Sequence, residues 1–456
     1  MTPSLDDFKD WYAKNEAGVR QDYFTFLKFP SISTDKAYHA DVCRTAQWLN
    51  NYLNKIGMDS VVWETSSKPV VFATYLKAGP LKPTLLIYHH YDVQPVDPLE
   101  LWKSPPFEPQ IIDDVVYARG ASDNKGQCFY TITAIRAFLE LAQDAQVNVK
   151  LFIEGEEESG GPGTYEVLEK KKTELKADHV LVVDAGLRSP DEPAVTVGVR
   201  GIMAMHLECI NAKIDLHSGL HGGIALNPNR ALILALAELF DEKGRVAVPG
   251  FYEDVLSFFE EDSAQLDMQF DVKSYQKQFG VYAFAHEEGY SPIQSNLLRP
   301  TLEINGIGGG YTGEGFKTVI PSKVIAKLSC RLVSAQDPHK IYEQIVSFIK
   351  LKLPEGITLK AEYHHGAKAF RSALQSQVVK IAANAYQEVW GKPCAYMLCG
   401  ASIPIVGALA EASGAEVALI GVGLDGDDIH APNEHFGMDR FRLGMLLMTN
   451  ILTRHI

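Results

Sequence analysis

The sequence is poor in cysteine and has no long apolar run. Its 456 residues include six cysteines, and no two of them form a C-x-x-C pair or a tight cluster. This argues against a disulfide scaffold or a structural zinc knuckle, and it indicates reduced thiols in a cytoplasmic protein. The longest apolar runs, such as 231–239, fall far short of the roughly 20 residues that span a bilayer. The acidic and aromatic N-terminus is unlike a secretory signal, so we expect neither a membrane segment nor a signal peptide.

Positive charge is also scarce. The chain carries 43 basic and 57 acidic side chains, which gives a formal net charge of −14. Such a chain is too acidic for a protein whose main role is to neutralise phosphate, so a nucleic acid is not an expected partner. The acidic excess either favours solubility in general or gathers some carboxylates at a cation site. Composition alone leaves both interpretations open.

The first part of the chain alternates helix and strand patterns. Short β-branched runs occur at 83–88, 147–153 and 179–183, with helical segments between them. This alternation predicts an α/β sheet covered by helices on both faces. Sheets of this kind carry functional groups where strands end and loops begin.

The middle of the chain has a different pattern. From about residue 193 the strand patterns are longer and group with two helical segments, which predicts a smaller α+β unit. The stretch 251–290 is expected to be an addition to this unit. Helix and strand then alternate again and end in a helix from about Asn433. The first domain is therefore predicted to be discontinuous, with segments 1–192 and 372–456 on either side of an insert, 193–371.

Possible metal ligands follow all three early strands. His90-Tyr91-Asp92 follows the first strand, a glutamate-rich segment follows the second, and Asp184 follows the third. His90 and Asp92 face the same side of the pleat, where the carboxylate could fix the tautomer of a metal-binding imidazole. A hydrogen-bonded pair that closes a turn is the alternative for this motif, and a plain turn is the alternative for Asp184.

The glutamate-rich segment crowds four carboxylates into five positions, 154–158, with no basic residue before Lys170. A divalent cation would relieve their repulsion, and one carboxylate could bind the ion while its neighbour carries a proton. The alternative is a solvated acidic loop.

Two further residues extend this set. Asp123 lies on a glycine-flanked turn before a predicted helix, where it could bridge two cations or belong to an ordinary N-cap. His430 lies in an acidic loop, although the neighbouring Pro432-Asn433-Glu434 also fits a plain helix start. Two divalent cations about 3.5–4 Å apart, sharing a carboxylate and a water, would use such ligands well. Imidazole and carboxylate without thiolate favour Zn²⁺, with Mn²⁺ or Co²⁺ as alternatives.

In this order, the motifs resemble the dinuclear zinc metallopeptidase family that includes the carnosinase-type dipeptidases, the aminoacylases and succinyl-diaminopimelate desuccinylase. The resemblance covers almost the whole chain, from the H-x-D pair through the D-N-K-G turn, the E-E-E-S-G loop and the V-V-D-A-G strand end to the late histidine. It implies a zinc-peptidase catalytic domain with a mixed sheet and an inserted α+β lid and dimerisation domain. It also implies the metal ligands: His90 and Asp184 for one ion, Glu158 and His430 for the other, and Asp123 for both.

The same resemblance implies catalytic roles. Glu157 would be the general base, and Asp92 would steady His90. His217 is similar to the family's histidine that stabilises the oxyanion, which the partner subunit contributes in dimeric members. Judged by its own neighbours alone, His217 is a histidine at a turn before Gly219.

Four residues resemble those that bind the free C-terminal carboxylate of a peptide, a contact to which a guanidinium is suited. They are Thr318, Arg331, His365 and Ser402. One stretch departs from the pattern, because Leu398-Cys399-Gly400-Ala401 stands where carnosinase-type members usually carry an arginine and paired glycines.

The resulting prediction is a homodimeric metallohydrolase that cleaves the amide bond of dipeptides with a metal-activated water. An N-acyl amino acid deacylase, of the aminoacylase or desuccinylase type, is one alternative. A non-catalytic metal- or peptide-binding protein on the same scaffold is the other. The length of the chain favours the dipeptidase branch, and the presence of Glu157 argues against a binding protein, which needs no base.

Overall fold

The computed structural model describes residues 2–142, 144–256, 266, 268–333 and 335–455. The chain divides into two compact units. Unit 1 contains Met1–Gly198, Ser372–Met397 and Ile405–Ile456, and unit 2 contains Val199–Arg371 and Leu398–Pro404.

Unit 1 is built on a mixed β-sheet with the strand order β1-β2-β6-β3-β7-β17-β8, and β16 also pairs with β8. Strands β6, β3, β7 and β17 are parallel, whereas β1, β2 and β8 pair antiparallel to their neighbours. The bounds are β1 (Asp59–Trp63), β2 (Val70–Tyr75), β3 (Thr84–His90), β6 (Asn148–Glu154), β7 (His179–Val183), β8 (Ala194–Val199), β16 (Ala395–Cys399) and β17 (Glu416–Ile420). This sheet confirms the predicted α/β class.

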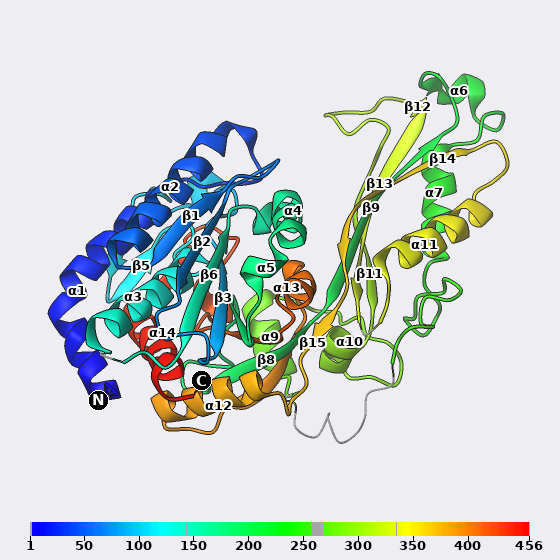
Figure 1. The fold of residues 1–456 in the computed structure, drawn as a ribbon. Coiled ribbons are helices and arrows are strands. Elements are labelled where there is room, and N and C mark those ends of the chain that lie inside the picture. The colour runs from blue at the N-terminus through cyan, green and yellow to red at the C-terminus, as the bar shows by residue number, and fades with distance from the viewer. Residues whose placement is uncertain (1, 143, 257–265, 267, 334, 456) are drawn as a thin grey trace. The chain divides into compact units, whose positions relative to one another are not determined.

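Helices cover both faces of this sheet, as Figure 1 shows. One face carries α1 (Leu5–Leu27), α2 (His39–Lys55), α3 (Lys125–Leu141), α12 (Gln377–Trp390) and α14 (Met438–Asn450). The other carries α4 (Pro162–Lys170), α5 (Lys172–Leu175) and α13 (Ile405–Ser413). An aromatic cluster joins the first group, because Trp48 of α2 contacts both Phe26 of α1 and Phe129 of α3. Covered on both sides, β6 and β7 are buried along their whole length, as parallel strands require.

Short elements complete unit 1. A small sheet contains β4 (Gln110–Ile112), β5 (Val115–Tyr117) and β18 (His435–Gly437), and the helical turns are η1 (Lys36–Tyr38), η2 (Leu99–Leu101), η3 (Glu157–Ser159), η4 (Asp425–Asp427) and η5 (Ile451–His455). The predicted last helix is present, but its expected start near Asn433 is wrong, because α14 begins at Met438. Residues 435–437 form a strand instead, with His435 paired to Tyr117.

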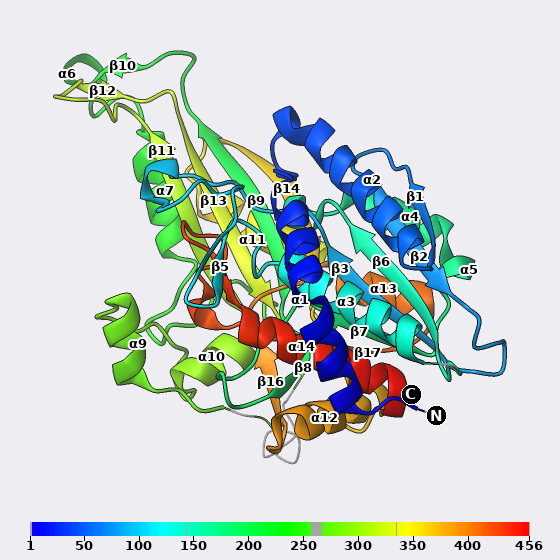
Figure 2. The same ribbon diagram turned by 90° about the vertical axis from the view of Figure 1, so that its left-hand side faces the viewer.

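Unit 2 contains a four-stranded antiparallel sheet in the order β11-β13-β9-β14. Its strands are β9 (Gly201–Ile210), β11 (Thr301–Gly309), β13 (Lys323–Leu332) and β14 (Thr358–Ala367). Burial alternates strictly along β9, so that Met203, Met205 and Leu207 face the core while the residues between them are half-buried. Helices α7 (Pro228–Ala237) and α11 (Pro338–Lys352) pack on the core side of this sheet (Figure 2).

The remaining elements of unit 2 are short. They are β10 (Leu216–His217), which pairs with β12 (Val319–Ile320), together with α6 (Ser218–His221), α9 (Val272–Phe279), α10 (Pro292–Leu298) and β15 (Phe370–Arg371). The stretch 251–290, expected as an addition to the insert, includes α9, while its residues 257–265 and 267 lie outside the described part of the chain.

The structure also bears on the two features that are scarce in the sequence. All six cysteines lie in the described ranges, and none of them forms a disulfide. Every helix that the structure describes is too short or too polar to cross a lipid bilayer.

Candidate metal centre

The parallel strands of unit 1 end together, and this brings the first candidate ligands to one edge of the sheet. His90 is the last residue of β3 and lies opposite Glu154, the last residue of β6. Asp184 directly follows β7, the other neighbour of β3. Because the carboxyl ends of parallel strands meet at one edge, side chains distant in sequence become neighbours there.

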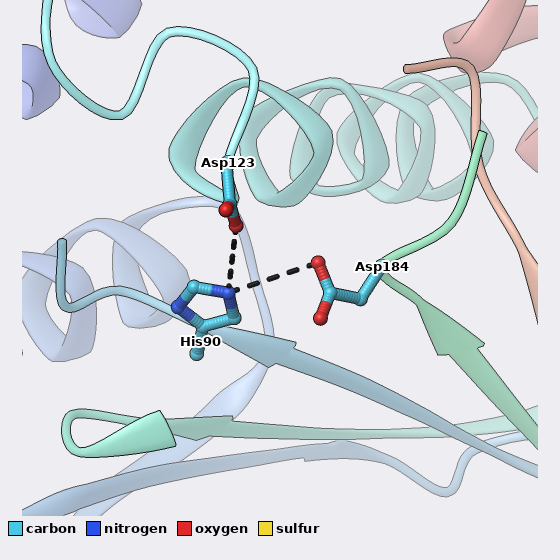
Figure 3. A group of neighbouring side chains, drawn as sticks. All are labelled: His90, Asp123 and Asp184. Atoms are coloured by element: carbon cyan, nitrogen blue, oxygen red, sulfur yellow. Dashed lines mark hydrogen bonds and ion pairs between the residues drawn. The ribbon is translucent and has the colours of Figure 1, made fainter. Parts of the chain in front are cut away.

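The imidazole of His90 is oriented by Asp92. Its Nδ1 lies 3.1 Å from the backbone oxygen of Asp92 and 3.4 Å from Oδ1 of the same residue. A backbone oxygen only accepts hydrogen bonds, so Nδ1 donates to it, and in the neutral ring Nε2 then presents a lone pair. That nitrogen lies 3.1 Å from Oδ1 of Asp123 and 3.7 Å from Oδ1 of Asp184. Figure 3 shows the two carboxylates facing it. The three atoms therefore form one candidate ligand group.

Asn124 supports this ligand group through hydrogen bonds of its side-chain amide. Its Nδ2 donates to Oδ1 of Asp184 (2.7 Å) and to the backbone oxygen of Val183 (2.9 Å). Its Oδ1 lies 2.9 Å from Nδ1 of the buried His89. The side chain that follows Asp123 in the sequence thus fixes the direction of Asp184.

Asp123 also belongs to a second ligand group, with Glu158 and His430. Nε2 of His430 lies 2.9 Å from Oδ2 of Asp123 and 3.3 Å from Oε1 of Glu158. Oε2 of Glu158 accepts a hydrogen bond from Gln94 (2.7 Å), whereas the buried Oε1 is the oxygen that faces His430. Asp123 therefore offers one carboxylate oxygen to each group.

The pKa shifts of this cluster indicate whether its side chains fit metal ions. Burial raises the pKa of Glu157 well above its usual range, and the neighbouring Glu158 and Asp184 raise it further. Burial likewise raises the pKa of Glu158 and of Asp184. Hydrogen bonds to Asp123 and Glu158 raise the pKa of His430 to about 10. Carboxylates packed this closely need positive charge between them, and nitrogen and oxygen ligands without thiolate fit two divalent cations.

Asp92 holds the turn that carries the two glutamates. The backbone N–H groups of Glu157 and Glu158 donate to Oδ1 and Oδ2 of Asp92, at 3.2 and 3.1 Å. Asp92 is fully buried, so its carboxylate joins the end of β3 to the turn η3. The sequence pattern indicates only the contact of Asp92 with His90.

Glu434 is a residue that the sequence analysis did not identify as part of the site. Its Oε2 accepts hydrogen bonds from the backbone N–H of Gly120 and from Nη1 of Arg119, both at 2.8 Å. Its Oε1 accepts from the backbone N–H groups of Ser122 (3.0 Å) and Asp123 (2.9 Å). The side chain is fully buried. Glu434 therefore holds the loop that presents Asp123, whereas its sequence context fitted an ordinary helix start.

Asp427 holds the same loop from the other side of His430. Its Oδ2 accepts from the hydroxyl of Ser122 (2.8 Å), and both of its oxygens bind the guanidinium of Arg440 at 2.6 Å. Between the two acids, His430 and Asn433 have φ angles of 60° and 69°, a region that side chains other than glycine rarely occupy. Buried anchors at both ends stabilise this strained segment.

The site residues expected in unit 2 fall in two places. His217 pairs with Val319 between β10 and β12, and the backbone oxygen of Thr318 accepts from the N–H of Ser218 at 3.0 Å. Nδ1 of His217 accepts a hydrogen bond from the N–H of Gly219 at 3.0 Å, so in the neutral ring the proton is on Nε2.

The other three lie at the four-stranded sheet. Nη1 of Arg331 donates to the hydroxyl oxygen of Ser402 at 2.7 Å, and that hydroxyl donates to the backbone oxygen of Gly201 at 3.0 Å. Burial lowers the pKa of His365, and the nearby charges of His364 and Arg331 lower it further. Arg331, His365 and Ser402 are therefore neighbours, apart from the small sheet of Thr318.

The role of Glu434 can be tested by replacing it with glutamine. Glu434→Gln keeps the shape of the side chain but turns N–H donors toward the loop amides and Arg119, so we expect the Asp123 loop to loosen. Metal affinity should then fall by about 10- to 100-fold, the usual effect of losing a supporting partner of a ligand. Competition with graded chelator, read as metal content per folded chain, measures this. Glu100→Gln, at an exposed acid of η2, is the control, and wild-type affinity in a folded Glu434→Gln protein would contradict the role.

Comparisons with known proteins place the chain in a family. The family described as peptidase family M20/M25/M40 matches residues 86–454. The Cys-Gly metallodipeptidase of Candida albicans is 29% identical over 91% of this chain and 90% of its own length. The human Beta-Ala-His dipeptidase is 32% identical over 80% of this chain and 73% of its own length. The crystal structure of an M20 family metallo-carboxypeptidase from Sulfolobus solfataricus has a TM-score of 0.88 and 32% identity, covering 96% of this chain and 99% of the other. The chain therefore belongs to peptidase family M20/M25/M40, which confirms the predicted family.

Proposed function

We propose that the protein is a metal-dependent dipeptidase with two divalent ions in its active site. The observation that most supports this proposal is the pair of ligand groups that share Asp123 at the carboxyl edge of the sheet. Two relatives whose names describe dipeptidases, from Candida albicans and human, support the choice of substrate. The Sulfolobus relative is named a metallo-carboxypeptidase, which also points to the amide bond nearest a free carboxyl terminus.

In this proposal, His90 and Asp184 bind one ion, Glu158 and His430 bind the other, and Asp123 binds both. The ligands are imidazole nitrogen and carboxylate oxygen, for which Zn²⁺ is the first candidate, with Mn²⁺ or Co²⁺ as alternatives. When bound, such a pair of ions lowers the pKa of a shared water and polarises the carbonyl of the scissile amide.

Glu157 is assigned the proton transfers. Its neighbour Glu158 belongs to a ligand group, whereas Glu157 belongs to neither group. Its carboxylate takes a proton from the attacking water and gives it to the nitrogen of the leaving amine. The hydrogen bond from the N–H of Glu157 to Asp92 holds the base on the same anchored turn as Glu158.

His217 is assigned to the oxyanion that forms on the carbonyl oxygen. Because its Nδ1 accepts the N–H of Gly219, its Nε2–H is available as a donor, which is the group that an oxyanion requires. We further propose that Thr318, Arg331, His365 and Ser402 bind the carboxylate end of the substrate. The protein is expected to work in the cytoplasm, in line with the absence of disulfides among its six cysteines.

We also propose that the protein is a homodimer that associates through unit 2. Helix α7 buries Leu232 and Leu236 but exposes Ile233 and Leu234, at 52% and 57% of their surface. At the edge of the sheet, β11 exposes Ile307 as well. Apolar side chains exposed on adjoining elements are typical of a surface that a second subunit covers.

The substrate is tested with a panel of dipeptides and N-acyl amino acids, assayed after loading with zinc and with manganese. We expect two ions per chain and the fastest turnover on dipeptides. Faster turnover of N-acyl amino acids would instead assign a deacylase. Metal binding without turnover of either class would leave a binding protein and contradict the proposed function.

The proposed base is tested by Glu157→Gln. An amide cannot accept the proton of the attacking water, so kcat should fall by about 10² or more while two ions still bind. Metal content and steady-state rates measure both effects, with Glu169→Gln on the exposed side of α4 as control. Near-normal turnover would remove Glu157 from this role.

The proposed dimer is tested by the double variant Ile233→Glu, Leu234→Glu. Charges in the centre of the interface should give monomers in sedimentation velocity, whereas wild type sediments as a dimer. Leu81→Glu, at a residue of unit 1 that is 97% exposed, should remain dimeric. If the partner subunit supplies His217, the monomeric variant also loses most of its activity. A monomeric wild type would contradict the dimer.

A further inference from the structure

Arg200 is a buried cation that belongs to none of the motifs in the sequence. The residue is 8% exposed. Its Nε donates to the backbone oxygen of Gly400 at 2.8 Å, and its backbone N–H donates to the oxygen of Ala401 at 3.0 Å. Its Nη1 is buried and has no hydrogen-bond partner among the described residues. An unmade hydrogen bond at a buried charged group is costly, so this nitrogen needs an acceptor.

A second guanidinium lies on the same face of the unit 2 sheet. Arg331 is paired with Ile202, which is two positions after Arg200. Arg200 directly precedes β9 in the chain, and side chains two apart along an extended segment point the same way. For Ile202 and Arg331 this is the face opposite to the one that α7 and α11 cover. Burial lowers the pKa of Arg200 to about 10, and the charge of Arg331 adds to this shift, while Cys399 and Glu303 oppose it. The two arginines are therefore close enough to repel each other.

Among the described residues, Glu303 is close enough for its charge to raise the pKa of Arg200, but it forms no ion pair with either arginine. Neither guanidinium forms an ion pair with a described carboxylate, although ion pairs are found for most other arginines of the structure. His365, which pairs with Ala204, brings a further imidazole to the same face. Taking two like charges out of water is expensive unless an anion binds between them. The arrangement is therefore one that an anionic ligand stabilises.

We infer that Arg200 binds the substrate carboxylate together with Arg331, so that each guanidinium donates to that group. The inference rests on the proposed function, which places the carboxylate end of a dipeptide at Arg331 and Ser402. A carboxylate accepts several hydrogen bonds and matches planar guanidinium donors. A C-terminal amide replaces one acceptor oxygen by an N–H₂ donor, which would face the N–H groups of the arginines. The pair thus selects peptides with a free carboxyl terminus.

Arg200 also holds the loop of Ser402 through its two bonds to Gly400 and Ala401. A purely structural role would affect all substrates in the same way, whereas carboxylate binding affects only substrates that carry the carboxylate. The test therefore compares one dipeptide with its C-terminal amide.

The experiment uses Arg200→Lys, Arg331→Lys and the control Arg44→Lys, at an exposed arginine of α2, each in the full metal-loaded chain. Wild type and Arg44→Lys should prefer the free acid strongly. Arg200→Lys should lose about 10- to 100-fold in kcat/KM on the free acid, chiefly through KM, in line with hydrogen bonds to a charged group. Its kcat/KM on the amide should stay within a few-fold of wild type. Equal losses on both substrates, or no loss on the free acid, would overturn the inference.

Binding measurements separate this inference from the proposed function. In a Glu157→Gln background, calorimetric titration with the free acid and with the amide reports the preference without turnover. If the preference is present and Arg200→Lys removes it, the inference holds even where wild type hydrolyses neither peptide. If Arg331→Lys removes the preference and Arg200→Lys does not, Arg200 is no part of the subsite. If wild type shows no preference, the whole carboxylate subsite, Arg200 included, is wrong.

Discussion

The carboxylate of Asp123 gives one oxygen to each of two ligand groups, and much of the surrounding structure serves to hold it. A carboxylate that serves two ions has little freedom, since a small rotation that suits one ion moves it away from the other. The Asp123 loop is accordingly held through its backbone N–H groups. Unlike a side chain, these groups cannot turn to another rotamer. The buried Glu434 accepts these N–H groups, and the buried Asp427 accepts the hydroxyl of Ser122 in the same loop.

The sheet explains how ligands so far apart in sequence meet. His90, Asp184 and the turn of Glu158 come from the ends of three neighbouring strands, two of which end in register. His430 has no strand of its own and reaches the site on a segment that is fixed at both ends, by Asp427 and by Glu434. Asp92 plays the corresponding part for the turn of Glu157 and Glu158. Each ligand thus has a buried polar partner that sets its position.

Much of this arrangement can be predicted from sequence, because it depends on local patterns. Apolar runs that end in His90 or Asp184 mark both a strand and its functional end. Glu434 could not be found in this way, because its partners are backbone groups more than 300 positions earlier in the chain. The sequence predicts too early a start for α14, for a related reason. Pro432-Asn433-Glu434 fits a helix start locally, but the pairing of His435 with Tyr117 makes residues 435–437 a strand and delays the helix. Arg200 likewise carries no local signal, because its significance lies in the nearness of Arg331.

The division of the chain has a consequence for its modular use. The polypeptide passes between the two units four times, because Leu398–Pro404 belongs to unit 2 although both of its flanks belong to unit 1. This short segment provides Ser402 and the two carbonyls that Arg200 binds. Excision of 199–371 as one cassette would therefore leave behind seven residues of the excised module. Any exchange of this module between relatives has to transfer both pieces together, so the face proposed to bind the carboxylate would move as a two-segment cassette.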